Sequence, residues 1–311
     1  MQTIADAASC IRIGVPMVFR NLTVFPLLGD QIVSADYLTL DEALEQKCSV
    51  ITEVSEGGSV PELKFVNSGN KCVFLLDGEE LIGAKQNRII NISILVAAGK
   101  TLVIPVSCVE AGRWSHRSRQ FASAPRAHYA QGRAMKMAQV SASMRATGQR
   151  RSNQSEVWRD ISEKSARFSV ASETSAMSDI FEKEAGQLED YVASFSILEG
   201  QSGAVFAIGG EVIGLELFDS AETLRKLFPK LLRSYGLDAL DRARREKSEK
   251  KTQCTPEKAA AFVRGVSAAK AEEFPALGEG IDIRLSGHNL TGAALVVKDH
   301  IIHMSAFASG N

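Results

Sequence analysis

The sequence lacks the features that mark several common classes of protein. Its five cysteines are scattered, with no Cys-x-x-Cys pair, so neither a zinc knuckle nor a redox dithiol is expected. No apolar run approaches the length of about 18 residues that a membrane span needs, because the best candidate, residues 89–98, contains Asn91 and Ser93. The first eleven residues carry no Lys or Arg, unlike the start of a secretory signal. These absences predict a protein of the reducing cytoplasm that has no membrane partner.

The common nucleotide-binding and catalytic motifs are absent as well. The chain has no Walker A loop, no Gly-x-Gly-x-x-Gly, no His-Glu-x-x-His and no Gly-x-Ser-x-Gly. Of the five histidines, His300 and His303 fall in one predicted hairpin, and two imidazoles without a third ligand make a weak metal site. No metal site is therefore predicted, the cofactor is unknown at this stage, and the question of catalysis stays open.

Charge is balanced overall but unevenly distributed. The 311 residues hold 36 Lys and Arg against 37 Asp and Glu, and 45% of them are hydrophobic. Residues 113–167 carry a net charge of +9, whereas the segments on either side carry -5 each. This predicts a β-rich part at 1–114, a basic and partly helical or mobile segment at 115–170, and an α+β part at 171–311. We expect the first and last parts to pack as one compact unit.

The apolar patterns predict an α+β fold with antiparallel hairpins in the N-terminal part, central helices, and further hairpins and helices toward the C-terminus. Thr39 is expected to cap a short helix, and Thr255 followed by Pro256 to open another. Spacings of three and four residues predict a helix over 177–195, and further helix over 221–245 with Pro229 starting a second segment. Strands are expected at residues 281–285, 293–297 and 301–307.

Two glycine turns predict β-hairpins. Asp77-Gly78 and Gly209-Gly210 each stand between apolar runs, and their residues tolerate the positive φ that tight hairpin turns need. The similarity of the two segments suggests either a weak internal repeat or chance.

The densest polar cluster spans residues 78–88. If residues 82–94 form one strand, Gln86 and Arg88 interrupt an otherwise apolar face, and a buried Arg88 needs a carboxylate, a ligand anion or solvent. The alternative is that residues 85–88 form an exposed polar bend.

A second cluster spans residues 105–114. Strand alternation carries Glu110 to the end of an apolar row, so we expect it to bond with Arg88 or to face the same pocket. Trp114 could stack on a planar ligand or pack in the core. Cys108 could be a nucleophile or simply a small buried side chain. The predicted ligand-binding residues of the two clusters are Lys85, Gln86, Asn87, Arg88, Ser107, Cys108, Arg113 and Trp114.

The basic segment could bind RNA or another polyanion. Between Arg113 and Ser155 there is no carboxylate, and clustered arginine suits phosphates. The predicted polyanion-binding residues are Arg145, Arg150 and Arg151. Alternatively, the segment pairs with the acidic parts of the same chain or of a neighbouring subunit.

Three blocks of sequence together resemble a known family. They read YLTLDEA at 37–43; LDGEELIGAKQNR at 76–88 with IPVSCVEAGRW at 104–114; and GAVFA at 203–207 with GLELFD at 214–219 and LLRSY at 231–235. These resemble the ARG and Rhodanese-Phosphatase-superfamily-associated protein domain, where ARG denotes ADP-ribosylglycohydrolase. The resemblance implies a role linked to NAD, ADP-ribose or RNA-end metabolism, including RNA repair, and supplies no catalytic set to carry over.

Three functional hypotheses follow. The first is a ligand-binding or accessory protein that recognises a phosphorylated nucleotide-like small molecule through the two polar clusters. The second is a hydrolase in which Glu80 and Glu110 act as general acid and base on a phosphoester or glycosidic bond. The third is a homo-oligomeric scaffold that docks its basic segment on a neighbour.

Overall fold

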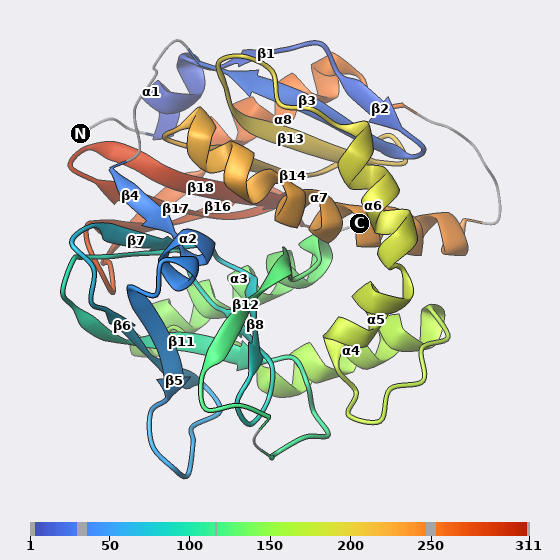
Figure 1. The fold of residues 1–311 in the computed structure, drawn as a ribbon. Helices are drawn as coiled ribbons and strands as arrows, with labels where there is room; N and C mark the ends of the chain where they lie inside the picture. The colour runs from blue at the N-terminus through green and yellow to red at the C-terminus, as the bar shows by residue number, and fades with distance from the viewer. Residues whose placement is uncertain (1–3, 30–35, 116, 247–252, 310–311) are drawn as a thin grey trace. The chain divides into compact units, whose positions relative to one another are not determined.

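The computed structural model describes residues 4–29, 36–115, 117–246 and 253–309 (Figure 1). The chain is α+β, and its contacts divide it into two compact units. Unit 1 comprises Met1–Ala35, Gln187–Ala276 and Gly280–Asn311, and unit 2 comprises Asp36–Gly186 and Leu277–Glu279. These boundaries lie elsewhere than the charge boundaries at residues 114 and 170.

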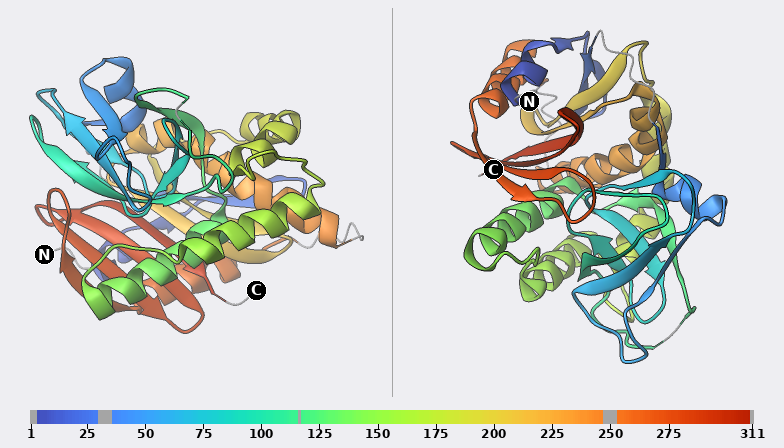
Figure 2. Two further views of the ribbon diagram at one scale, coloured as in Figure 1. Left: turned by 90° about the horizontal axis from the view of Figure 1, so that it is seen from below. Right: turned by 90° about the vertical axis from the view of Figure 1, so that its left-hand side faces the viewer.

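Unit 1 is built on an antiparallel sheet that has nine strands in the described part of the chain. Its order is β1-β3-β13-β14-β18-β17-β16-β15, with β2 also paired to β3. The last four strands form a meander, coloured orange to red in Figure 2. The bounds are β1 Arg12–Ile13, β2 Met17–Phe19, β3 Leu22–Leu28, β13 Gln201–Ile208, β14 Glu211–Phe218, β15 Lys270–Pro275, β16 Ile281–Gly287, β17 Leu290–Val297 and β18 His300–Ala308.

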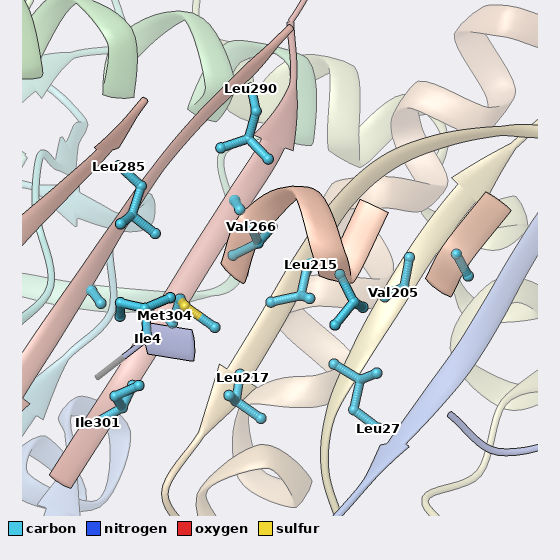
Figure 3. Close-up of a cluster of buried hydrophobic side chains, with 14 of the residues drawn as sticks. Ile4, Leu27, Val205, Leu215, Leu217, Val266, Leu285, Leu290, Ile301 and Met304 are labelled. Atoms are coloured by element: carbon cyan, nitrogen blue, oxygen red, sulfur yellow. The ribbon is translucent and has the colours of Figure 1, made fainter. Parts of the chain in front are cut away.

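Helices cover both faces of this sheet. Helix α8, Pro256–Ser267, contacts β14, β16 and β17 and meets α1, Ile4–Ser9, whereas α7, Ala221–Arg245, packs on β13 and β14. Figure 3 shows the core under α8, where Val266 lies among the sheet residues Leu215, Leu285 and Leu290. In the described ranges, no helix combines the length and the apolar character needed to cross a lipid bilayer.

Unit 2 contains two sheets and carries the polar clusters. Within the described residues, one sheet has the order β10-β7-β4 and the other has the order β12-β8-β9-β11-β6-β5. The outermost strands of the larger sheet, β5 and β12, also contact each other, so this sheet curls round on itself. The strands are β4 Tyr37–Thr39, β5 Ser49–Glu53, β6 Glu62–Asn67, β7 Cys72–Leu75, β8 Glu79–Gly83, β9 Arg88–Ile90, β10 Ile94–Val96, β11 Thr101–Cys108 and β12 Phe121–Ala127. The helices are α2 Leu40–Glu45, α3 Ala130–Thr147, α4 Gln154–Arg167 and α5 Met177–Lys183.

The helix caps predicted from sequence are confirmed. Thr39 and Glu42 form a reciprocal capping box at the start of α2, and the Thr255 side chain accepts from the Lys258 N–H at the start of α8. Two helical boundaries were predicted wrongly. Pro229 lies inside the continuous helix α7, and the helix expected over 177–195 is divided at Glu184 into α5 and α6, Ala185–Ser194.

One of the two predicted hairpins is confirmed. Gly209 and Gly210 join β13 to β14 with φ values of 57° and 86°. The prediction for Asp77-Gly78 is wrong, because β7 belongs to the smaller sheet and β8 to the larger one. The turn itself forms, with Gly78 at φ 84°, but it moves the chain from one sheet to the other.

Candidate functional site

The segment 84–87 is a buried bend between β8 and β9. Gly83 has φ 124° and Ala84 has φ 38°, so the chain turns there and does not continue as one strand. A side chain at Gly83 would lie 2.6 Å from Ser118 Oγ and 2.9 Å from the Gln120 carbonyl oxygen, which explains the need for glycine. The next four side chains, Lys85 to Arg88, are all buried. Neither the continuous strand nor the exposed bend predicted from sequence is therefore correct.

Glu110 is held by Arg113. Arg113 Nε lies 2.9 Å from Glu110 Oε1, and Nη2 lies 2.7 Å from Oε2. The Asn87 N–H and the Thr174 hydroxyl also donate to this carboxylate, at 3.0 Å and 2.9 Å. Burial acts to raise the pKa of Glu110, but these hydrogen bonds outweigh it and hold the pKa below the ordinary value of 4.5. The predicted bond between Glu110 and Arg88 is thus wrong.

Arg88 is fully buried and incompletely bonded. Its Nη1 donates to Gln86 Oε1 at 3.0 Å, whereas no described residue accepts a hydrogen bond from its Nε or Nη2. Burial lowers the pKa of Arg88, with the charges of Cys108 and Glu53 acting in the opposite sense. Its guanidinium carbon is 5.8 Å from the centre of the Trp114 ring, and Trp114 is 49% exposed. Within the described chain, two nitrogens of a buried cation therefore lack an acceptor near a half-exposed tryptophan.

Glu53, which the sequence did not single out, belongs to the same cluster. Both of its carboxylate oxygens are buried, and neither has a hydrogen-bond partner in the described chain. A Cβ at Gly58 would lie 3.3 Å from Glu53 Oε2, 3.3 Å from Lys85 Cδ and 3.4 Å from Trp114 Cζ2, so these three side chains converge on one point. A carboxylate following the buried Ile51 by two residues on a strand is the signal that could have identified it.

Lys85 has backbone partners. Its ammonium donates to the carbonyl oxygens of Glu56 and Gly57, both at 2.7 Å, and lies 5.3 Å from the centre of the Trp114 ring. It therefore ties the loop after β5 to the bend that follows β8. We name Glu53, Lys85, Arg88, Cys108 and Trp114 the Arg88 cluster.

The remaining predicted residues divide between the two faces of the sheet. Cys108 pairs directly with Arg88 across β11 and β9, its Sγ is 3.1 Å from Gln86 Oε1, and burial raises the pKa of its thiol. Ser107 points to the opposite face, where its hydroxyl donates to Asn91 Oδ1 at 2.6 Å. Asn87 Oδ1 accepts from Arg113 Nη2 at 3.3 Å, so Asn87 supports the Glu110 ion pair.

Glu80 lies away from the Arg88 cluster. It pairs with Ile89 across β8 and β9, whereas its neighbour Leu81 pairs with Arg88, so Glu80 and Arg88 project from opposite faces. Its Oε2 accepts a short hydrogen bond from Arg126 Nε, and its buried Oε1 has no partner among the described residues. Burial raises the pKa of Glu80, although the nearby charge of Arg126 acts to lower it.

Three side chains of the basic segment form buried ion pairs inside unit 2. Arg133 and Lys136 both donate to the buried carboxylate of Asp77, and Arg126 donates to Glu80. The predicted polyanion-binding residues lie outside these pairs. Arg145 and Arg151 are exposed, Arg150 is half-buried, and Arg151 lies 3.8 Å from Glu62.

An open groove of about 690 Å³ lies elsewhere in unit 2. It runs between the end of α2, the start of β5 and the edge strand β12, with Asp41, Ser49 and Phe121 among its lining residues. None of the predicted site residues lines this groove, and none of its lining residues belongs to the Arg88 cluster.

The family model for the ARG and Rhodanese-Phosphatase-superfamily-associated Protein domain matches residues 10–307. The chain belongs to this family. The match confirms the family that the three sequence blocks predicted. It spans both units and includes every residue of the Arg88 cluster. Comparisons with curated proteins and with solved structures find no match.

Proposed function

We propose that this member of the family is a cytoplasmic ligand-binding or accessory protein, and that the Arg88 cluster recognises a phosphorylated nucleotide-like molecule. The observation that carries the proposal is the guanidinium of Arg88, which is fully buried while its Nε and Nη2 find no acceptor in the described chain. A buried cation with unused donors is costly unless something bonds to it.

A phosphate group suits the free side of Arg88. Nε and one terminal nitrogen form the planar fork with which arginine binds phosphate oxygens in a bidentate manner. The Nη1 bond to Gln86 fixes the orientation of the guanidinium, so less side-chain entropy is lost when an anion binds.

An aromatic ring in the ligand could stack on Trp114. The indole is half-exposed and lies next to Lys85 and Arg88, so one of its surfaces can receive a planar group while the phosphate reaches the cation. The family description names an association with ARG and phosphatase-superfamily proteins. This association supports a ligand from NAD, ADP-ribose or RNA-end metabolism.

A thermal-shift screen tests this proposal. ADP-ribose, NAD, mononucleotides and a short RNA are each added to the full-length protein. At a hundredfold excess over Kd, a true ligand is expected to stabilise the fold by about 2.7 kcal/mol. The absence of a shift with all four classes of compound contradicts the proposal.

A hydrolase is the second candidate, and it rests on the two carboxylates. The pKa of Glu80 is raised by burial while hydrogen bonds lower that of Glu110, the divergence that an acid and base pair shows. Under this candidate, Glu80 donates a proton to the leaving group of a phosphoester or glycosidic bond and Glu110 activates water. The assay measures hydrolysis of ADP-ribose by the wild-type protein and by a folded Glu110→Gln variant. Hydrolysis that continues in Glu110→Gln eliminates Glu110 as the base.

A further inference from the structure

Glu53 and Arg88 share one face of the larger sheet of unit 2. Glu53 pairs with Leu63, Leu63 pairs with Ile104, and Cys108, four residues after Ile104 on β11, pairs with Arg88. Residues directly opposite each other on neighbouring strands share a face, as do residues separated by two or four positions along one strand. The curled sheet thus presents a carboxylate and a guanidinium on the same side.

These opposite charges do not bond to each other. The charge of Glu53 acts on Arg88, yet within the described residues both Glu53 oxygens and two Arg88 nitrogens have no hydrogen-bond partner. The cluster therefore offers acceptors at one position and donors at another. A ligand that uses both must carry hydrogen-bond donors for Glu53 and an anion for Arg88.

The donors for Glu53 are best supplied by neutral hydroxyls. Lys85 and Arg88 both lie beside the Trp114 ring, so a cationic group on a ligand would meet two positive charges there. A carboxylate only accepts hydrogen bonds, and its two oxygens can take two neighbouring O–H groups at once. Carboxylates of Asp and Glu bind ribose hydroxyls in this way in dinucleotide-binding folds.

We propose that Glu53 binds the vicinal diol of a ribose whose phosphate is bound by Arg88. The inference rests on the proposed function and narrows it, because it requires a ribonucleotide and disfavours deoxyribonucleotides and free phosphate. Gly58, with φ 76°, carries no side chain at the point where Glu53, Lys85 and Trp114 converge.

Calorimetry with nucleotide analogues tests this inference. AMP, 2′-deoxy-AMP and 2′,3′-dideoxy-AMP are titrated into the wild-type protein, into Glu53→Gln, and into Glu62→Gln as a control on the neighbouring strand. Because hydrogen bonds to charged groups are strong, wild type and Glu62→Gln are expected to bind AMP at least about tenfold more tightly than dideoxy-AMP. In Glu53→Gln this preference is expected to shrink markedly.

The possible failures are distinguishable. Equal affinity for AMP and dideoxy-AMP overturns the role of Glu53 while the proposed nucleotide site stands. A preference that Glu53→Gln retains in full also overturns that role. If none of the three analogues binds, the role of Glu53 and the proposed site are both overturned for mononucleotides. The wild-type analogue series decides the matter alone if Glu53→Gln does not fold.

Discussion

Arg113 and Glu110 form a doubly hydrogen-bonded ion pair, with Nε 2.9 Å from Oε1 and Nη2 2.7 Å from Oε2. Both side chains are almost completely buried. Arg113 binds the carboxylate that strand alternation had placed beside Arg88, and Arg88 Nε and Nη2 have no hydrogen-bond partner among the described residues. A structural ion pair and a buried, incompletely hydrogen-bonded cation therefore lie a few residues apart in one motif.

Breaking this ion pair is expected to destabilise the fold strongly. Arg113→Met leaves Glu110 as a buried carboxylate without its cation, and such a loss typically costs about 3 to 5 kcal/mol. The double variant Arg113→Met with Glu110→Leu is expected to be less destabilised than the sum of the single variants, because it strands no charge. Urea denaturation measures all three. Additive effects would contradict a direct coupling between the two residues.

Arg88→Met is expected to cost much less stability than Arg113→Met. Arg88 donates to Gln86 and forms no hydrogen bond to a carboxylate of the described residues, so its removal leaves none of these carboxylates without a bonded cation. The large cost of about 3 to 5 kcal/mol arises when one partner of a bonded buried pair is removed, which Arg88→Met does not do. We expect the two variants to differ by at least about 2 kcal/mol in urea denaturation. Equal losses would show that Arg88 is mainly a structural residue.

The stability contribution of Glu110 is expected to vanish in acid. Its folded-state pKa lies below 4.5, so between that pKa and 4.5 the unfolded chain binds more protons than the folded chain. The contribution is complete above about pH 5 and is lost as the pH falls through the folded-state pKa. The stability difference between wild type and Glu110→Gln should therefore narrow only below about pH 4.5. A difference that does not change with pH contradicts the lowered pKa.

Glu80 provides a control for Glu110, because its pKa is shifted in the opposite direction. Burial raises its pKa above 4.5, so the folded chain binds more protons than the unfolded chain in the window above 4.5. Wild type is expected to lose stability relative to Glu80→Gln as the pH rises through that window. The same trend for Glu80→Gln and Glu110→Gln would contradict the opposite shifts.

Three arginines of the basic segment allow a salt test of RNA binding. If they bind RNA, affinity should fall by about 0.7 log units per log unit of salt for each phosphate neutralised. Replacing Arg145, Arg150 and Arg151 with Gln is expected to flatten this slope, whereas the same change at the exposed Arg225, Arg244 and Arg245 is not. An unchanged slope contradicts the polyanion interpretation, and dissociation of an oligomer would favour the scaffold hypothesis.

Local rules predicted the parts of the fold that depend on a few neighbouring residues. The cap at Thr39 depends on a hydrogen bond from the backbone N–H of Glu42, three residues later, and the Gly209-Gly210 turn needs only positive φ. The Asp77-Gly78 turn forms for the same local reason. Its strands separate because β7 finds partners in β4 and β10, which lie about 20 to 35 residues away in the sequence.

The candidate site was predictable only in part. Arg88 is buried, but the continuous strand on which the alternation argument depended does not form. The backbone turns at Gly83 and Ala84, and the loop after Cys108 gives Glu110 a different partner. Thr174 reaches Glu110 across 64 residues of sequence, and Glu53 comes from a strand that short-range spacing does not connect to the motif. The net charge of the basic segment likewise could not show that Arg133 and Lys136 are buried against Asp77.

Titration calorimetry of ADP-ribose with matched arginine variants tests the central claim most directly. Wild type and Arg245→Met, a change at an exposed helix end, are expected to bind with the same Kd. Arg88→Met, shown to be folded by its denaturation curve, is expected to bind at least about tenfold more weakly, since it lacks the charged donors for the phosphate. Equal Kd values for wild type and Arg88→Met would contradict a ligand site at Arg88.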